Sequence, residues 1–430
     1  MICLATLLHF YQPPTQVHSI LDKITDESYR PLVNVLQSNS NARVTVNING
    51  CLTEMLAEHG KSDVLKSLDE LARRKQIEFT GSGMYHPILP LIPQSEMIRQ
   101  INENRRTNQR LIGSSFQPRG FFPPEMCYGK NIIDPILSTG HEWVIMSGIA
   151  CPVEWPISAI NYINSSFGKL FVFFRDDVLS NRISFHEIDV QGFINHLILF
   201  NGDKSEDIYV VTAMDAETFG HHIKNWEKDF LDAFYKAISG RDTPSKRTNI
   251  RTKKVEKIVS TGRINELVKT VTISELLDSF KSGQAIYPRP SSWSTTDEDI
   301  KKDNPYPLWN DPDNQVHKLL WEHLNLTIDM VNKAAGCSDN SISQRFTGFA
   351  RESLDLSLHS DQFWWASRRP QWDVNLIHRG LVLQQECLLN AYQGIRTCNS
   401  LDSNVKTEYH YRHAAAEDIA NTIRRLLFDS

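Results

Sequence analysis

The sequence has 430 residues, of which 40% are hydrophobic, 10% aromatic and 23% charged. These proportions are close to globular averages and exclude a disordered, collagenous or coiled-coil chain. The 46 lysines and arginines face 51 aspartates and glutamates, a formal charge of -5, so we expect no nucleic-acid partner. The length predicts one large barrel with an appendage, or two to three domains.

No stretch approaches the roughly 18 consecutive apolar residues of a membrane-spanning helix, so we expect no membrane contact. The residues before His9 lack a basic region and are too short for the core of a signal peptide, so we interpret them as a strand. The seven cysteines are widely spaced and contain no Cys-x-x-Cys pair, which favours neither a disulfide framework nor a zinc ribbon. We therefore expect a cytoplasmic protein.

Short β-rich runs alternate with amphipathic stretches through the first part of the chain. One such stretch, 62–75, carries Val64, Leu65, Leu68 and Leu71 on one helical face. The alternation predicts βα units and a parallel sheet. The seven predicted strands are 2–8, 43–48, 76–80, 120–122, 143–146, 170–174 and 208–214.

The polar residues that could carry chemistry fall just after these strands, which favours a closed barrel over an open doubly wound sheet. No glycine-rich dinucleotide or phosphate-binding motif follows the first strand. The segment 241–263 holds eight lysines or arginines and only two acids, Asp242 and Glu256. We interpret this basic segment as an exposed insertion, with a patch for an anionic partner as the alternative.

The rest of the chain predicts a strand that ends near Val271 and a helix capped by Thr272 or Ser274. A Pro-, Ser- and Trp-rich loop, 286–312, is expected to reach back over the barrel mouth. Four helices are predicted after it, at 314–335, 341–358, 374–394 and 411–427. We therefore divide the chain into a barrel, 1–285, with the basic insertion, and a helical region, 286–430, that completes an active-site cleft.

Two strand ends carry acids. Glu125 follows a short apolar strand and two prolines, which hold the backbone extended. The apolar run 209–214 leads directly into Asp215 and Glu217, with His221 and His222 close behind. Polar residues concentrated where a parallel strand leaves the core indicate a functional site, although helix caps and ion pairs are the alternative at both places.

Other strand ends and the later loops supply groups that suit a sugar. His9 and Gln12 follow the first strand, and His86 follows the third. Trp293 lies in the long loop, and the run 359–366 combines His359 and Asp361 with two tryptophans. Indole faces stack on the apolar faces of sugars. The alternatives are that the histidines are structural and that the tryptophans fix the helical region to the barrel.

Five ordered blocks, 9–13, 83–91, 120–125, 214–221 and 359–365, together resemble the five sequence regions of glycoside hydrolase family 57. The resemblance implies a (β/α)7 barrel followed by a helical region, retaining chemistry on α-linked glucan or oligosaccharide, and neither a cofactor nor a catalytic metal. At this length we also expect no additional C-terminal β-domain.

By the same resemblance, Glu125 is the nucleophile and Asp215 the general acid/base, both catalytic. The substrate-binding positions implied by the blocks are His9, Gln12, His86, His359, Asp361 and Trp364, and we add Glu217, His221 and Trp293 as further candidates. Two positions depart from the family pattern: Tyr11 stands where the first block has a histidine, and Phe122 where the third has a tryptophan.

Two other classes of function stay open at this point. A metal-dependent deacetylase or mannosidase on a related barrel could use His9, His86, Asp215, His221 and His222, which include acceptable zinc ligands. A carbohydrate-binding protein that has lost turnover is the second alternative, although it would have no need of both Glu125 and Asp215. The sequence separates neither hydrolase from transferase nor one oligomeric state from another.

Overall fold

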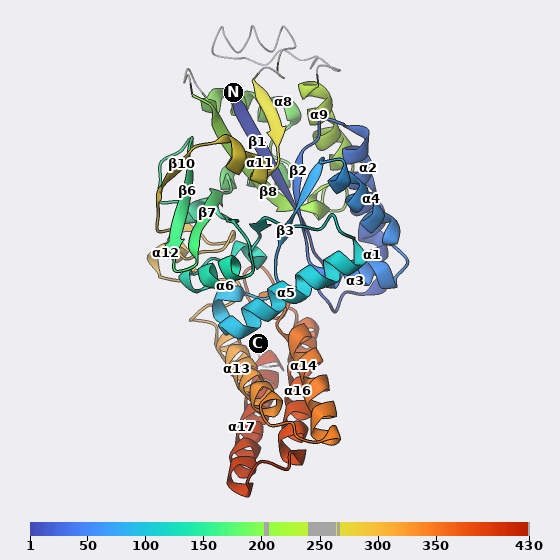
Figure 1. Cartoon of the computed structure of the whole chain (residues 1–430), viewed down its shortest axis with the longest axis vertical. Helices are drawn as coiled ribbons and strands as arrows, with labels where there is room; N and C mark the ends of the chain where they lie inside the picture. Colours follow the sequence, from blue (N-terminus) through green and yellow to red (C-terminus); the bar gives the residue numbers. More distant parts are fainter. Residues whose placement is uncertain (202–205, 240–263, 265–266, 429–430) are drawn as a thin grey trace. The chain divides into compact units, whose positions relative to one another are not determined.

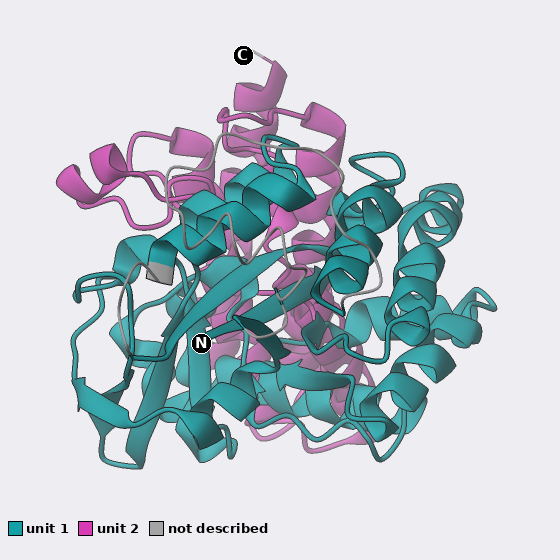
Figure 2. Ribbon diagram, turned by 90° about the horizontal axis from the view of Figure 1, so that it is seen from above, with its two compact units in different colours: residues 1–84, 89–293 teal, residues 85–88, 294–430 magenta. Residues whose placement is uncertain are grey.

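The structure is a computed structural model that describes residues 1–201, 206–239, 264 and 267–428 (Figure 1). The predicted basic insertion 241–263 lies outside the described residues. The chain forms two compact units (Figure 2). Unit 1 comprises Met1–Met84 and Leu89–Trp293, and unit 2 comprises Tyr85–Ile88 and Ser294–Ser430. Our division of the chain into domains at residue 285 stays a prediction.

Unit 1 is built on one sheet whose strands follow the order β10-β6-β7-β5-β4-β3-β2-β1-β8, with β9 also paired to β1. All seven predicted strands are present and pair in parallel. The sequence did not predict β6, which is antiparallel to β7, or β10. The strands are β1 Ile2–Phe10, β2 Val44–Ile48, β3 Ile77–Gly81, β4 Gly120–Phe121, β5 Trp143–Met146, β6 Ile160–Ser165, β7 Gly168–Phe174, β8 Ile208–Asp215, β9 Val268–Val271 and β10 Ser282–Ala285.

The sheet curls so that β7 and β8 meet along a seam held by the residues after β7. The Asp176 backbone N–H donates to the Val211 carbonyl over 2.7 Å. On the same strand, the carbonyl of Ala213 accepts from Arg175 Nε over 2.8 Å and its N–H donates to Ser180 Oγ over 3.1 Å. The seven parallel strands therefore form the predicted (β/α)7 barrel.

Alternation along β1 divides its side chains between two environments. Leu4, Leu8 and Phe10 pack with the helices in the main apolar core. Cys3, Leu7 and His9 consequently point to the other face, into the barrel. The helices of unit 1 are α1 His18–Ile24, α2 Arg30–Ser38, α3 Gly50–Glu58, α4 Ser62–Arg73, α5 Gln94–Leu111, α6 Ile133–Ser138, α7 Asp177–Ser184, α8 Val190–Asn201, α9 Ala233–Ile238 and α11 Ile273–Ser279.

Local signals explain where these helices begin. In α4 the predicted apolar stripe of Val64, Leu65, Leu68 and Leu71 is buried. Helix α11 begins after Thr272, whose side chain accepts from the Glu275 N–H while the Glu275 carboxylate accepts from the Thr272 N–H. This reciprocal capping box confirms Thr272 as the cap.

Unit 2 is helical, as predicted, and α13, α14, α16 and α17 pack side by side in it (Figure 1). Helix α13 begins at an asparagine cap, Asn314, which accepts from the N–H groups of Val316 and His317. The helices of unit 2 are α12 Asp297–Lys301, α13 Gln315–Ala335, α14 Ser341–Ser357, α15 Asp361–Trp364, α16 Val374–Thr397 and α17 Ser403–Phe428. In the described residues, no helix is both long enough and apolar enough to cross a membrane.

Candidate active site

A row of polar side chains runs across the carboxyl ends of neighbouring strands in unit 1. His9 on β1 is in register with Asp215 on β8 and with Asn47 on β2. His9 Nδ1 lies 2.6 Å from Asn47 Oδ1, and Asn47 Nδ2 donates to Thr80 Oγ1 over 3.0 Å. Because the amide nitrogen of Asn47 is used by Thr80, its oxygen accepts from His9, which places a proton on Nδ1.

Glu125 is held in an unusual backbone conformation at the end of β4. After Pro123 and Pro124 the chain makes one short helical turn, Pro124–Met126, in which Glu125 adopts φ 58°. This left-handed conformation is strained for a residue with a Cβ, and such strain concentrates at functional sites. The turn aims the carboxylate toward Trp293, whose indole Nε1 donates to Glu125 Oε2 over 2.8 Å.

Part of the predicted loop 286–312 reaches the strand ends within unit 1. The Trp293 N–H donates to the Glu125 carbonyl over 3.1 Å, and Ser291 pairs with Tyr128. Trp293 is therefore fixed to Glu125 through both its backbone and its side chain. This contact could not be predicted from the sequence, because the two residues are far apart along the chain.

Aromatic rings surround His9. Phe122 stacks on the imidazole at a centroid distance of 4.6 Å, and Tyr11 lies parallel to it at 5.8 Å. Trp293 meets both His9 and Phe122 edge-on, at 5.8 and 5.9 Å. The two positions that depart from the family pattern, Tyr11 and Phe122, thus both contact the same histidine.

Asp215 ends β8 in a partly buried position next to a buried arginine. Burial raises the pKa of Asp215 above the usual aspartate range, and the nearby Arg175 guanidinium lowers it in opposition. Arg175 is 4% exposed and directly follows β7. The raised pKa favours a protonated aspartate at a pH where an exposed one would be ionised.

Glu217 lies behind Asp215 in a closed hydrogen-bond network. Its Oε1 accepts from the Tyr29 hydroxyl and from Gln12 Nε2, the latter over 2.9 Å. The Gln12 oxygen in turn accepts from Gln16 Nε2 over 2.7 Å. Burial, and then the charge of Asp215, raise the pKa of Glu217 well above its usual range. Both ends of the Gln12 amide, a predicted sugar ligand, are thus used inside the protein.

His221 does not join the hydrogen-bond network of Glu217 and contacts Glu27 instead. Its Nδ1 is 2.7 Å from Glu27 Oε2, and this contact lowers the pKa of the Glu27 carboxyl. Gly220 has φ +109°, and a Cβ there would come within 1.9 Å of the Glu27 carbonyl oxygen. Only glycine fits this close approach, so Gly220 fixes the path of the chain between Glu217 and His221.

Unit 2 brings together the predicted residues of the second and fifth blocks. His86 Nδ1 lies 2.9 Å from Ser360 Oγ, and the Ser360 N–H donates to the His86 carbonyl over 3.1 Å. His359 is fully buried, with Nδ1 3.3 Å from Asp361 Oδ2. Its Nε2 has no hydrogen-bond partner among the residues that the structure describes. Trp364 ends α15 and is partly exposed.

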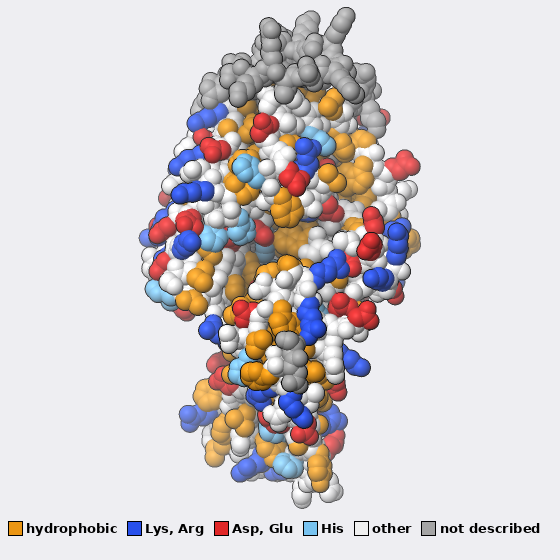
Figure 3. Space-filling view, turned by 180° about the vertical axis from the view of Figure 1, so that it is seen from behind, with side chains coloured by type: hydrophobic (Ala, Val, Ile, Leu, Met, Phe, Trp, Pro, Cys, Tyr) orange, Lys and Arg blue, Asp and Glu red, His pale blue; other side chains and the backbone are white. Residues whose placement is uncertain are grey.

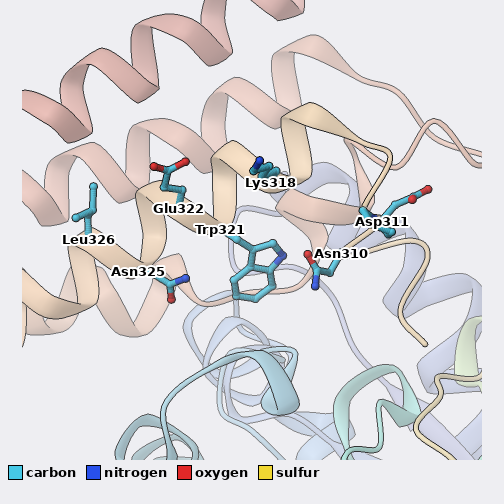
Figure 4. A pocket seen from close by; sticks show the side chains of 8 residues that line it. Asn310, Asp311, Lys318, Trp321, Glu322, Asn325 and Leu326 are labelled. Carbon is cyan, nitrogen blue, oxygen red and sulfur yellow. The ribbon is translucent and has the colours of Figure 1, made fainter. Parts of the chain in front are cut away.

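Unit 2 also has a surface pocket of about 730 Å³ along α13 (Figure 4). Trp321 lies in it with amide and carboxylate side chains around it, a composition that suits sugars. However, Trp321 is only 7% exposed, and one face stacks on Phe363 at 4.0 Å with the rings 3° from parallel. Its indole N–H is bonded to the Trp309 carbonyl. The indole therefore serves packing within unit 2.

A hydrogen bond, ring contacts and strand register join Glu125, Trp293, His9 and Asp215, with Glu217 and Gln12 behind them. His86, His359, Asp361 and Trp364 belong to unit 2. The residues that sequence reasoning missed are Arg175, Asn47 and Tyr29. Arg175 was detectable, because it follows a predicted strand just as Glu125 and Asp215 do, whereas Asn47 and Tyr29 lie within elements and carry no such signal.

Within the described ranges, no group of three or more His, Cys, Asp or Glu side chains is arranged to hold a metal ion. The site instead presents carboxyl groups among aromatic rings at the strand ends of a barrel. Two carboxyl residues at the strand ends of such a barrel are typical of the class of barrel enzymes that includes glycosidases.

Comparison with known proteins identifies the family within this class. Residues 6–283 match the model of glycosyl hydrolase family 57, so the chain belongs to that family. An alpha-amylase from Pyrococcus horikoshii is 25% identical over 248 residues, which cover 55% of this chain and 37% of the relative. A 4-alpha-glucanotransferase from Thermococcus kodakarensis is 26% identical over 242 residues, covering 52% of this chain and 35% of the relative.

The fold agrees with a solved member of the family. The crystal structure of a branching enzyme from Thermococcus kodakaraensis superposes with a TM-score of 0.68 at 14% identity, covering 97% of this chain and 95% of that chain. At this identity the likeness establishes the fold alone. The matched part of the chain spans little more than a third of the length of the two curated relatives.

Proposed function

We propose that the protein is a retaining glycoside hydrolase or transglycosylase that acts on α-linked glucan or oligosaccharide. In this proposal ionised Glu125 attacks the anomeric carbon while Asp215 donates its proton to the departing glycosidic oxygen. Asp215 then takes a proton from water or from a sugar hydroxyl, which releases the glycosyl group from Glu125. The family and the names of its relatives support the glucan as substrate.

The observation that carries the proposal is the different environment of the two carboxyl groups. Glu125 accepts a hydrogen bond from the Trp293 indole, which can only donate, and this bond favours the ionised form that a nucleophile needs. Asp215 is partly buried, and its raised pKa favours the protonated form that a general acid needs. One carboxyl group that is favoured in its ionised form and one that is favoured in its protonated form are suited to act as nucleophile and general acid.

The groups around them suit sugar hydroxyls and sugar faces. Trp293 and Tyr11 are partly exposed aromatic rings beside His9. In unit 2, the buried Nε2 of His359 lacks a protein partner among the described residues, and a buried polar atom of this kind is satisfied by a ligand hydroxyl at a gain in affinity. We assign substrate binding to His9, Trp293, His86, His359, Asp361 and Trp364, and the positioning of Asp215 to Glu217 and Gln12.

The direct test is the product pattern from maltoheptaose incubated with the wild type, Glu125→Gln and Asp215→Asn. We expect the wild type to shorten the chains or redistribute their lengths, and each variant to lose at least about a thousandfold in rate. The anomeric configuration of the first product, followed by NMR, is expected to be retained. Products that are only shorter indicate water as the acceptor, and longer products indicate a sugar.

Other outcomes would favour the alternative functions. Turnover that survives Glu125→Gln but is lost on treatment with a chelator would point to a metal-dependent enzyme. Binding of the oligosaccharide without any product, in the wild type and on a panel of other α-linked oligosaccharides, would point to a carbohydrate-binding protein. Either result would overturn the assignment of Glu125 and Asp215 as a catalytic pair.

A further inference from the structure

Arg175 is a buried cation whose hydrogen bonds all go to the end of the barrel near Asp215. Its Nε donates to the Ala213 carbonyl over 2.8 Å, two residues before Asp215 on β8. Its two terminal nitrogens donate to Asp177 Oδ1 and Asn181 Oδ1, each over 2.8 Å. The guanidinium is thus held by three bonds in one plane, a geometry that lysine could not reproduce.

The hydrogen bonds that hold Arg175 extend to a third strand, β5. The second oxygen of Asp177 accepts from Ser147 Oγ over 2.8 Å and from the Ile149 N–H over 3.0 Å, both just after β5. The Arg175 N–H donates to the Met146 carbonyl on β5 over 2.8 Å. Gly148 permits this contact, because a Cβ there would come within 2.6 Å of the Arg175 carbonyl oxygen. Arg175 therefore ties β5, β7 and β8 together at their carboxyl ends.

The same guanidinium faces the residue that holds the other carboxyl group. Its Cζ lies 5.9 Å from the centroid of the Trp293 ring, within the range of a cation–π interaction. Trp293 in turn donates to Glu125 Oε2. One buried side chain is therefore bonded to the strand that presents Asp215 and lies over the ring that orients Glu125.

We infer that Arg175 is a positioning residue. It sets the geometry of both carboxyl groups and supplies a positive charge beside Asp215. This inference rests on the proposed function, because it assigns Arg175 a role in the same reaction. The groups that face Asp215 are His9 on β1, Arg175 after β7, Glu217 in the following turn and Tyr29 behind it. Arg175 is the one permanent cation among them, so its removal leaves Asp215 without a permanent positive charge beside it.

The test compares Arg175→Gln and Arg175→Lys with the wild type, using the pH profile of kcat on maltoheptaose. In Arg175→Gln the alkaline limb, which reports loss of the Asp215 proton, is expected to move up by about one pH unit, because the lost cation favoured ionised Asp215. In both variants the plateau kcat is expected to fall by about tenfold to a hundredfold, because the carboxyl groups lose their fixed positions. Arg175→Lys keeps the charge, so its limb is expected to stay near the wild-type position.

The matched control is Arg119→Gln. Arg119 precedes β4, at the opposite end of the strands, and it bonds Glu142 and Asp278. Loss of the Arg119 guanidinium removes these ion pairs. It is expected to leave both the alkaline limb of the pH profile and the plateau kcat unchanged. An Arg175→Gln profile that matches this control would overturn the inference. If Arg175→Gln does not fold, Arg175→Lys decides alone, and a wild-type plateau in that variant would overturn the inference.

A second measurement separates this inference from the proposed function. The pKa of Asp215 can be followed without a substrate, by infrared difference spectra of the ¹³C-labelled carboxyl group, with Asp215→Asn to identify its band. Arg175→Gln is expected to raise that pKa by about one unit. If the wild type turns over no oligosaccharide, the proposed function fails while this titration still supports or overturns the electrostatic role of Arg175.

Discussion

In the proposed mechanism Trp293 both contacts the substrate and orients Glu125, the latter through its indole N–H. Trp293→Phe keeps an aromatic ring and removes the bond to Glu125 Oε2. A hydrogen bond to a charged group contributes about 1.5–3 kcal/mol, so we expect kcat to fall by about tenfold to a hundredfold. Steady-state kinetics on maltoheptaose measures this.

Trp143→Phe is the matched control for that variant. Trp143 begins β5 at the other end of the barrel, and its indole donates to Ser274 Oγ over 2.9 Å. Its loss should lower the unfolding midpoint and leave kcat within about twofold of the wild type. Equal losses of kcat in the two variants would contradict the role of the Trp293 N–H.

Glu217 is predicted to work as a neutral acid. Its raised pKa keeps it protonated near neutral pH, so Glu217→Gln preserves both charge and shape. We expect this variant to keep kcat within about threefold, whereas Glu217→Ala leaves Tyr29 and Gln12 without their acceptor and costs about 2–4 kcal/mol. Urea unfolding and kinetics on both variants measure this. Loss of activity in Glu217→Gln with unchanged stability would show that the charge is needed.

At the residue scale, the sequence was informative where a side chain directly follows a strand. Glu125 and Asp215 were both selected on that ground, and both lie at strand ends. Arg175 follows β7 in the same way and carries the same signal. Tyr29 was beyond prediction, because its bond to Glu217 joins residues 188 positions apart.

At the scale of elements, the start of α13 depends on a histidine that must stay neutral. The Asp311 N–H donates to His317 Nδ1 over 3.0 Å, so Nε2 carries the proton and donates to the Phe363 carbonyl over 2.8 Å. Burial lowers the pKa of His317 to about 4. Protonation would remove the acceptor for Asp311 and loosen the turn that precedes α13.

This arrangement predicts an acid-sensitive stability. The unfolded chain takes up a proton at His317 first, near its ordinary pKa of about 6.5, so stability falls as the pH drops from about 6.5 toward 4, by up to roughly 3 kcal/mol. We expect His317→Gln to lose less stability than the wild type between pH 7 and pH 5 in urea unfolding. The exposed His378→Gln serves as the control and should follow the wild type. An unchanged pH dependence in His317→Gln would contradict this prediction.

Strands and helices were largely predictable because their apolar periodicity is local. All seven barrel strands and the four long helices of unit 2 were identified. Strand β6 was missed because its pairing with β7 is a hairpin whose polar run, Ile160–Ser165, lacks a clear apolar pattern. Strand β10 was missed for the same reason: the run Ser282–Ala285 is short and polar, and its place is set by β6.

At the scale of the whole molecule, acidic and basic residues are nearly equal in number. We therefore expect the protein's charge to have little effect on the binding of a neutral substrate. The formal charge is -5 over 430 residues, and basic and acidic side chains are interspersed over the face shown in Figure 3. We expect kcat/KM for maltoheptaose to change by less than about twofold between 0.05 and 0.5 M salt. A steep fall with salt would contradict a neutral sugar as substrate and indicate an anionic one.

In the proposed mechanism Glu125 forms a covalent bond to the sugar, and trapping the glycosyl-enzyme tests this directly. Asp215→Asn cannot supply a proton, but α-maltosyl fluoride has a leaving group that needs none, so a glycosyl ester should accumulate. Mass spectrometry of the digested protein is predicted to find a maltosyl group on the peptide that contains Glu125, and none in the double variant Glu125→Gln and Asp215→Asn. A maltosyl group on another residue, or fluoride release that persists in the double variant, would contradict the account.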